Sequence, residues 1–91
     1  MAERIIRYAF SRRFQKEYKS LPGDIQEAFE KKLSLFLDNF YHPSLRVKKI
    51  AGTADRWEGS VTMNYRFTFQ MEAERLLFRR IGTHDILKKE T

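Results

Sequence analysis

The chain has 91 residues, enough for one modest core, and we expect a single domain spanning residues 1–91. Hydrophobic residues make up 42% and aromatic residues 14%, which excludes a disordered polar tail. The formal net charge of +6 favours an anionic partner: nucleic acid, a membrane surface or an acidic protein.

The chain contains no cysteine, which excludes disulfides and thiol chemistry and is typical of a protein in the reducing cytoplasm. The N-terminal segment has no long apolar stretch followed by a small-residue cleavage site, so we expect no signal peptide. No apolar run approaches the roughly 20 residues of a membrane span. We therefore expect a cytoplasmic protein without a membrane partner.

The first predicted element is a short, half-buried strand over Ile5–Phe10. Ser11 is a suitable N-cap for the helix that follows it. Apolar residues recur at helical spacing in this helix: Phe14, Tyr18 and Leu21. Its other faces carry four cations, which fit either a solvated surface or contacts to nucleic acid: Arg12, Arg13, Lys16 and Lys19.

A second helix follows a short break at Leu21–Asp24, because Pro22 suits a first helical turn and Asp24 complements the helix dipole. Its apolar stripe is long and aromatic: Ile25, Phe29, Leu33, Phe36, Leu37 and Phe40. So short a connection predicts that the two helices form an antiparallel hairpin.

The middle of the chain is irregular and basic. Tyr41–Leu45 is predicted to be a loop, because Pro43 disfavours helix at its predecessor. His42, one of two histidines, is either ordinary surface or a functional group. The basic segment Arg46–Ile50 then leads to a turn at Thr53–Asp55.

The C-terminal half predicts three strands in an antiparallel meander. The first covers Trp57–Met63, and the second has the clearest alternation of the chain, over Tyr65–Met71. The third begins with the apolar run Leu76–Phe78, after a turn at Met71–Arg75. Lys88–Thr91 is a polar tail.

The order of these elements predicts an α+β fold. A short N-terminal strand precedes a two-helix antiparallel hairpin, which packs on one face of a small, mainly antiparallel sheet. The other face is expected to be open to a partner. If Tyr65, Phe67 and Phe69 pack beneath the helices, Arg66 projects onto the open face. Either Arg79 or Arg80 joins it there, since one bulge would exchange them.

The segment Arg79–Asp85 at the end of the last strand combines two guanidinium groups, a glycine, a hydroxyl, an imidazole and a carboxylate. Fixed positive charge beside a group that titrates near neutral pH suits phosphate chemistry. The alternative is a solvated strand end whose arginines pair with Asp85 or Glu90.

The remaining sequence lacks the signatures of most other chemistries. It has no phosphate-binding glycine-rich loop and no serine nucleophile motif, and its two histidines lie far apart. We therefore expect no metal and no small-molecule cofactor. Arginine, histidine and lysine do suit metal-free RNA cleavage, in which a 2′-hydroxyl attacks the adjacent phosphate and guanidinium groups stabilise the developing charge.

Three segments carry a resemblance to a known family: Lys48–Gly52, Trp57–Gly59 leading to Asn64–Phe69, and Arg80–His84. With the element order, length and charge, they make the chain similar to the RelE/ParE superfamily of bacterial toxins, in its RelE-like mRNA interferase branch. The resemblance implies a ribosome-dependent endoribonuclease that cleaves mRNA and inhibits translation. It also implies a cognate antitoxin, which we expect to be acidic, as partner beside the ribosome and mRNA.

The resemblance also implies roles for individual residues. His84 matches the family's proton-transfer histidine, Arg80 its phosphate-stabilising arginine and Lys49 the lysine before the glycine. Arg66 matches a middle-strand arginine that is catalytic or structural. Further basic residues are expected to bind nucleic acid: Arg46, Lys48, Arg56 and Arg79.

The chain departs from the family pattern at two places. Ser60–Met63 lacks the basic residue common late in that strand, and Ile86–Lys88 lacks the aromatic that stacks on a base. Two alternatives therefore stay open. One is a ParE-like toxin that inhibits gyrase without nuclease activity, and the other is a non-toxic module that only binds an antitoxin.

Overall fold

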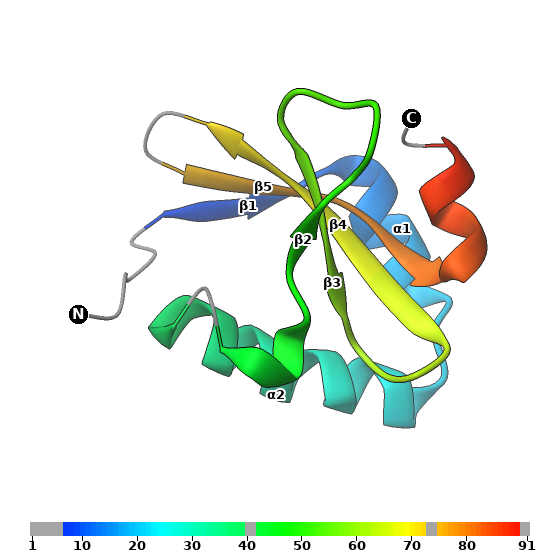
Figure 1. The fold of residues 1–91 in the computed structure, drawn as a ribbon. Helices are drawn as coiled ribbons and strands as arrows, with labels where there is room; N and C mark the ends of the chain where they lie inside the picture. The colour runs from blue at the N-terminus through cyan, green and yellow to red at the C-terminus, as the bar shows by residue number, and fades with distance from the viewer. Residues whose placement is uncertain (1–6, 40–41, 73–74, 90–91) are drawn as a thin grey trace.

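The computed structural model describes residues 7–39, 42–72 and 75–89 of the chain (Figure 1). Its helices and strands, in order, are β1 (Tyr8–Phe10), α1 (Arg12–Lys19), α2 (Gly23–Asp38), β2 (Lys48–Lys49), β3 (Arg56–Ser60), β4 (Tyr65–Glu72) and β5 (Arg75–Thr83). Two 3₁₀ helices complete it: η1 (Pro43–Leu45) and η2 (His84–Lys89). Some predicted positions lie outside the described residues: Ile5, Ile6, Phe40, Tyr41, Ala73, Glu74, Glu90 and Thr91.

The strands form one mixed sheet in the order β1-β5-β4-β3-β2. β1 pairs parallel with β5, whereas β2–β3, β3–β4 and β4–β5 are antiparallel. The predicted α+β class and the three-strand meander are therefore confirmed. The strand β2 was not predicted, because a two-residue lysine segment carries no alternation of apolar and polar residues.

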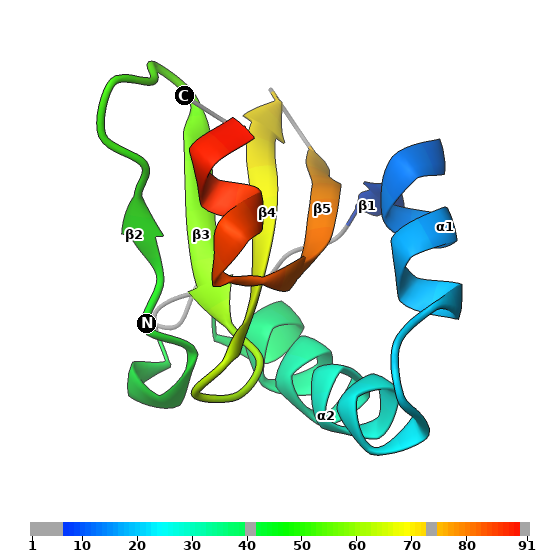
Figure 2. The ribbon, with the colours of Figure 1, turned by 90° about the vertical axis from the view of Figure 1, so that its right-hand side faces the viewer.

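α1 begins at the predicted N-cap, Ser11, which also attaches the helix to the sheet. The Ser11 Oγ accepts a hydrogen bond from the Phe14 amide at 3.0 Å and donates one to the Arg79 carbonyl at 2.8 Å. The Ser11 amide donates to the Phe78 carbonyl at 2.9 Å. α1 therefore flanks β5 from the point where β1 ends, as Figure 2 shows.

The core is an aromatic cluster between the helices and one face of the sheet. Phe78 of β5 is fully buried, and its ring centroid lies 5.1–6.4 Å from those of Phe10, Phe14, Phe29, Phe36, Phe67 and Phe69. A Cβ atom at Gly59 would lie 2.3 Å from Phe67 Cζ. Glycine is therefore required at this position, where β3 passes over the ring.

The predicted strand Trp57–Met63 ends three residues early, at Ser60. The Val61 amide donates to the Tyr65 carbonyl at 3.0 Å, which closes a turn, and Met63 is 89% exposed. The predicted loop at Tyr41–Leu45 contains the 3₁₀ helix η1, because Leu45 is fully buried and draws this segment against the core.

The second face of the sheet was expected to be open to a partner, and this prediction is wrong because η2 lies across that face (Figure 2). Ile86 of η2 is 7% exposed, and a Cβ atom at Gly82 would lie only 3.0 Å from Ile86 Cγ2. Three buried polar residues lie on this face, Glu58 and Ser60 of β3 and Thr68 of β4. η2 runs to Lys89, so Lys88 and Lys89 of the predicted polar tail belong to this helix, whose apolar residue Ile86 is buried on the sheet.

Candidate functional site

His84 lies in a solvent-open recess at the end of β5. It is exposed, and the recess of about 440 Å³ is lined by Met63, Asn64, Thr83, His84 and Asp85. The register of β4 and β5 pairs Tyr65 with Thr83, which brings the β3–β4 turn beside the first residues of η2. The structure thus presents the predicted imidazole to solvent beside two strand ends.

Arg66 lies near this end of the sheet, because its Cα pairs with Gly82, two residues before His84. Its guanidinium is used within the β3–β4 hairpin. Nη1 donates to Ser60 Oγ at 2.8 Å and to the Thr62 carbonyl at 3.0 Å. Nε lies 4.0 Å from Glu58 Oε1, and the Arg66 side chain is 17% exposed. Arg66 therefore stabilises the hairpin and points only a small surface to solvent.

Arg79 and Arg80 occupy an irregularity in the β4–β5 ladder. Thr68 pairs with Arg80 but the next residue, Phe69, pairs with Phe78, so Arg79 is an extra residue on β5. Arg79 Nη1 donates to Gln70 Oε1 at 3.0 Å. The bulge puts Arg79 on the polar sheet face with Gln70, and the Arg80 side chain points in a different direction from that of Arg79.

Arg80 is held by Glu17 of α1. Its Nη2 lies 2.6 Å from Glu17 Oε2, and its side chain is 11% exposed. Glu17 Oε1 also accepts the Ile81 amide at 3.2 Å, so it covers the edge of β5 where β1 has already ended. Among the described residues, Arg80 therefore has a carboxylate partner from α1, whereas the alternative considered above was a pairing of the arginines with Asp85 or Glu90.

Arg80 keeps one donor that this ion pair does not use. Its Nη1 is buried and has no hydrogen-bond partner among the described residues. Neither Arg66 nor Arg80 is among the residues that line the recess around His84. The predicted guanidinium groups therefore lie near the histidine in the sheet but do not converge on it.

The predicted lysines lie at the opposite edge of the sheet. Lys48 pairs with Glu58 and Lys49 with Trp57, and both lysines are exposed. Three strand spacings of about 4.8 Å separate β2 from β5, which is roughly 14 Å. Lys49 is therefore not brought to His84, although Lys48 belongs to the same cross-strand row as Arg80.

Arg46, Arg56 and His42 have local structural settings. Arg46 is exposed and caps η1 with a positive φ of 48°. Arg56 Nε lies 3.9 Å from Asp55 Oδ1. His42 Nδ1 accepts the Ser44 amide at 3.2 Å, so this histidine is the N-cap of η1. Its role in the described structure is that of a helix cap.

Within residues 7–39, 42–72 and 75–89, no group of three or more His, Asp or Glu side chains is arranged to hold a metal ion. No helix in these ranges is both long and apolar enough to cross a membrane.

Sequence reasoning missed Glu17 as the partner of Arg80. The two residues are 63 positions apart, and Glu17 has the appearance of an ordinary charged residue on a basic helix. Only the pattern Arg13–Glu17 gives a local signal, an i,i+4 pair with an N–O distance of 3.9 Å. That signal points along the helix and not to the sheet.

No protein-family model and no curated protein sequence matches the chain. Solved structures do match its fold. A chain of the RelB–RelE antitoxin–toxin complex from Methanococcus jannaschii is 22% identical, with 90% of this chain and 96% of that chain covered and a TM-score of 0.74. YafQ from E. coli is 16% identical, with 93% and 98% covered and a TM-score of 0.73. A free mutant of the E. coli toxin RelE is 21% identical, with 92% and 90% covered and a TM-score of 0.69.

Proposed function

Because the chain has the fold of the RelE/ParE superfamily toxins, we propose that it is the toxin of a toxin–antitoxin pair and cleaves ribosome-bound mRNA without a metal ion. The observation that carries the proposal is the exposed His84 in its recess at the end of β5. A histidine titrates near neutral pH, so it can exchange protons with a ribose–phosphate linkage.

The cleavage step balances without a cofactor. The 2′-hydroxyl oxygen bonds to phosphorus as it loses its proton, and the bond from phosphorus to the 5′ oxygen breaks. The 5′ oxygen takes up one proton, so the reaction is redox-neutral and no proton is gained or lost overall. His84 is the residue we assign to this proton transfer, because its exposed imidazole lies at the strand end and an imidazole can both accept and donate a proton.

The cations contribute unequally to this proposal. Lys48 and Lys49 are exposed and suit long-range attraction of RNA, in keeping with the net charge of +6. Arg66 offers a small exposed surface near His84 and can stabilise phosphate charge while it holds the hairpin. Arg80 reaches a phosphate only when its ion pair with Glu17 opens, so we assign it a positioning role.

An acidic antitoxin is the partner that the charge of the chain supports best. The net charge of +6 favours a segment rich in carboxylates. The matched structure from M. jannaschii is a complex of antitoxin with toxin. A toxin that acts on translating ribosomes works in the cytoplasm, which is where we place it.

The test compares the two histidines of the chain. His84→Ala should lower mRNA cleavage by roughly 100- to 10,000-fold, the usual contribution of general acid–base catalysis, and should restore growth of expressing cells. His42→Ala is the matched control, because this residue caps η1 away from the recess, and should stay toxic. Full toxicity of a folded His84→Ala protein would reject the assignment.

A second candidate is a ParE-like toxin that inhibits gyrase without chemistry of its own. It is favoured by one observation: the guanidinium groups of Arg66 and Arg80 both lie at carboxylates of the chain itself. Induction of the DNA damage response with intact mRNA in expressing cells would support it. Loss of mRNA without DNA damage would support the nuclease.

A further inference from the structure

A second groove lies between α1 and the end of β5. Its volume is about 720 Å³, and its lining comes from α1, the α1–α2 connection, β4 and β5: Arg12, Arg13, Lys16, Glu17, Ser20, Leu21, Tyr65, Ile81, Gly82 and Thr83. The three cations are exposed and lie on one helix. They provide a row of positive charge along one wall of the groove.

The groove and the recess around His84 meet at Thr83. This residue lines both spaces, and His84 follows it directly in the chain. Figure 2 shows α1 beside β5 and η2 starting from the end of that strand. The two spaces therefore adjoin at the end of β5.

Negative charge in the groove is largely neutralised. Glu17 is the one carboxylate among the described residues that line the groove. Its oxygens already accept the Arg80 guanidinium and the Ile81 amide, and Arg13 lies 3.9 Å away. Three cations against one engaged carboxylate leave the groove positive, which suits a polyanion.

Tyr65 supplies an aromatic ring in this basic groove. It is half-buried at the first position of β4, opposite Thr83. Sites for single-stranded nucleic acid combine backbone-tracking cations with aromatic rings on which bases stack. The segment after β5, Ile86–Lys88, has no aromatic residue, whereas Tyr65 is the aromatic residue among the described residues that line the groove.

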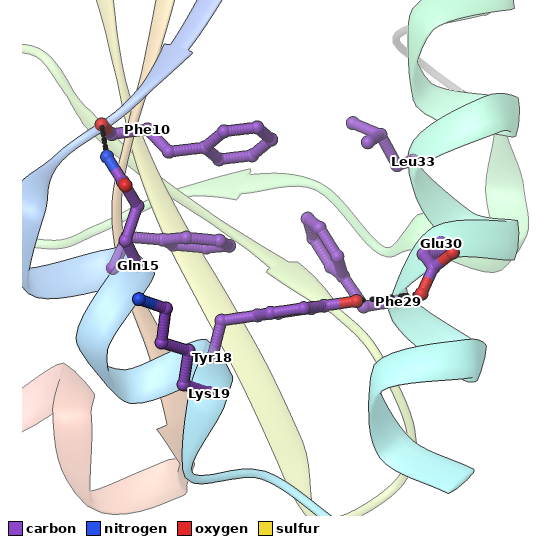
Figure 3. A pocket seen from close by; sticks show the side chains of 8 residues that line it. Phe10, Gln15, Tyr18, Lys19, Phe29, Glu30 and Leu33 are labelled. Carbon is purple, nitrogen blue, oxygen red and sulfur yellow. Dashed lines mark hydrogen bonds between the residues drawn. The ribbon is translucent and has the colours of Figure 1, made fainter. Parts of the chain in front are cut away.

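A third space gives a useful contrast. The groove between α1 and α2 has a volume of about 320 Å³ and a mostly apolar lining that includes Phe10, Tyr18 and Leu33 (Figure 3). Lys19 is the cation on its rim. Such a lining provides few groups that can bind phosphate, whereas the groove between α1 and β5 provides both positive charge and the aromatic ring of Tyr65.

We infer that the groove between α1 and β5 binds single-stranded RNA next to the cleavage site. Tyr65 stacks on a base, and Arg12, Arg13 and Lys16 contact the phosphates beside it. The inference rests on the proposed function and adds a binding site to it. An acidic protein segment in the same groove is the competing occupant, and the experiment separates the two.

The experiment measures binding without cleavage. Full-length His84→Ala protein is titrated into a fluorescent single-stranded RNA oligonucleotide at several salt concentrations, with anisotropy as the readout. Adding Tyr65→Leu should weaken binding by about 5-fold to 100-fold, the range for loss of one stacked base. Adding Tyr65→Phe keeps the ring and should leave the affinity within about twofold. Thermal unfolding checks that each variant is folded.

The charge contribution is tested on α1 itself. Lys16→Gln should lower the slope of log affinity against log salt by about 0.7, the value for one phosphate of a single strand. Lys19→Gln is the matched control, because it removes the same charge from the same helix but lines the apolar groove. The control should leave the slope unchanged.

Two outcomes would overturn the inference. One is equal binding of single-stranded and duplex RNA with no effect of Tyr65→Leu. The other is complete displacement of the RNA by polyglutamate combined with an unchanged affinity of Tyr65→Leu, which would assign the groove to an acidic protein. Cleavage of mRNA by the protein with His84 intact is measured separately, so failure of the proposed function and failure of this site are read from different assays.

Discussion

The two faces of the sheet are built on different principles. The face toward α2 is closed by phenylalanine rings, and Phe36, Phe69 and Phe78 have no exposed surface. The opposite face carries the buried polar residues Glu58 and Thr68 and is covered in part by η2, which contacts β4 and β5. One face buries aromatic rings, whereas the other buries polar side chains together with Ile86.

This difference separates the residues that stabilise the fold from the candidate catalytic residues. An aromatic face tolerates little change, because its rings interlock at crystal-like density. The polar face and the adjoining edge of β5 carry the arginines, and His84 follows at the strand end. Stability and candidate chemistry are thus separated across the thickness of one sheet, and mutations should report on one or the other.

The largest effect should come from the centre of the aromatic face. Phe78→Ala removes a fully buried ring and leaves a cavity, so it should lower the free energy of unfolding by about 3–5 kcal/mol. Urea denaturation measures this. Met63→Ala, at an 89% exposed position, should stay within about 0.5 kcal/mol of the wild type. Equal effects of the two changes would contradict the packing described for this face.

A smaller effect is expected on the opposite face. Ile86→Ala removes most of the apolar side chain with which η2 packs on the sheet, and should cost about 2–3 kcal/mol in the same denaturation assay. If η2 instead frays freely from the sheet, the cost should vanish. Met71→Ala is a suitable exposed control on β4.

The ion pair at the edge of β5 should contribute less again. Glu17→Gln weakens the charge-assisted bonds to Arg80, so it should cost about 1.5–2 kcal/mol of unfolding free energy. Arg13→Gln disturbs only the exposed pair along α1 and should cost no more than about 0.5 kcal/mol. A larger loss from Arg13→Gln than from Glu17→Gln would mean that Arg80 is not held as described.

A pH dependence is expected on the α1–α2 side. Burial, followed by the hydrogen bond and the charge of Glu30, raises the pKa of Tyr18 from 10.0 to about 12. The folded state then holds the proton more tightly than the unfolded state. The resulting stabilisation is complete below pH 10 and is lost as the pH rises from about 10 to about 12.

Phenolate absorbance checks this prediction. A component that titrates near pH 12 in the folded protein should be missing from Tyr18→Phe and should move to about pH 10 in the urea-unfolded wild type. Absorbance that develops entirely near pH 10 in the folded wild type would contradict it.

Local patterns were sufficient for much of the fold. The sequence predicts the N-cap Ser11, whose side chain accepts a hydrogen bond from an amide only three residues away. The alternation over Tyr65–Met71 identifies β4, because one face of this strand is buried. The directions of the side chains in the candidate site were harder to predict from the sequence. A bulge sets the directions of Arg79 and Arg80, and the alternation of residues in β5 gives no sign of it.

By itself the sequence determined the α+β class, the helix pair, the three-strand meander and the strand end that carries His84. These features depend on interactions between residues close together along the chain, so a periodicity reveals them. The tertiary structure alone decided that Glu17 holds Arg80, that η2 covers the polar face and that Lys49 lies across the sheet from His84. Each of these depends on contacts between distant segments, and no local pattern encodes which segments will meet.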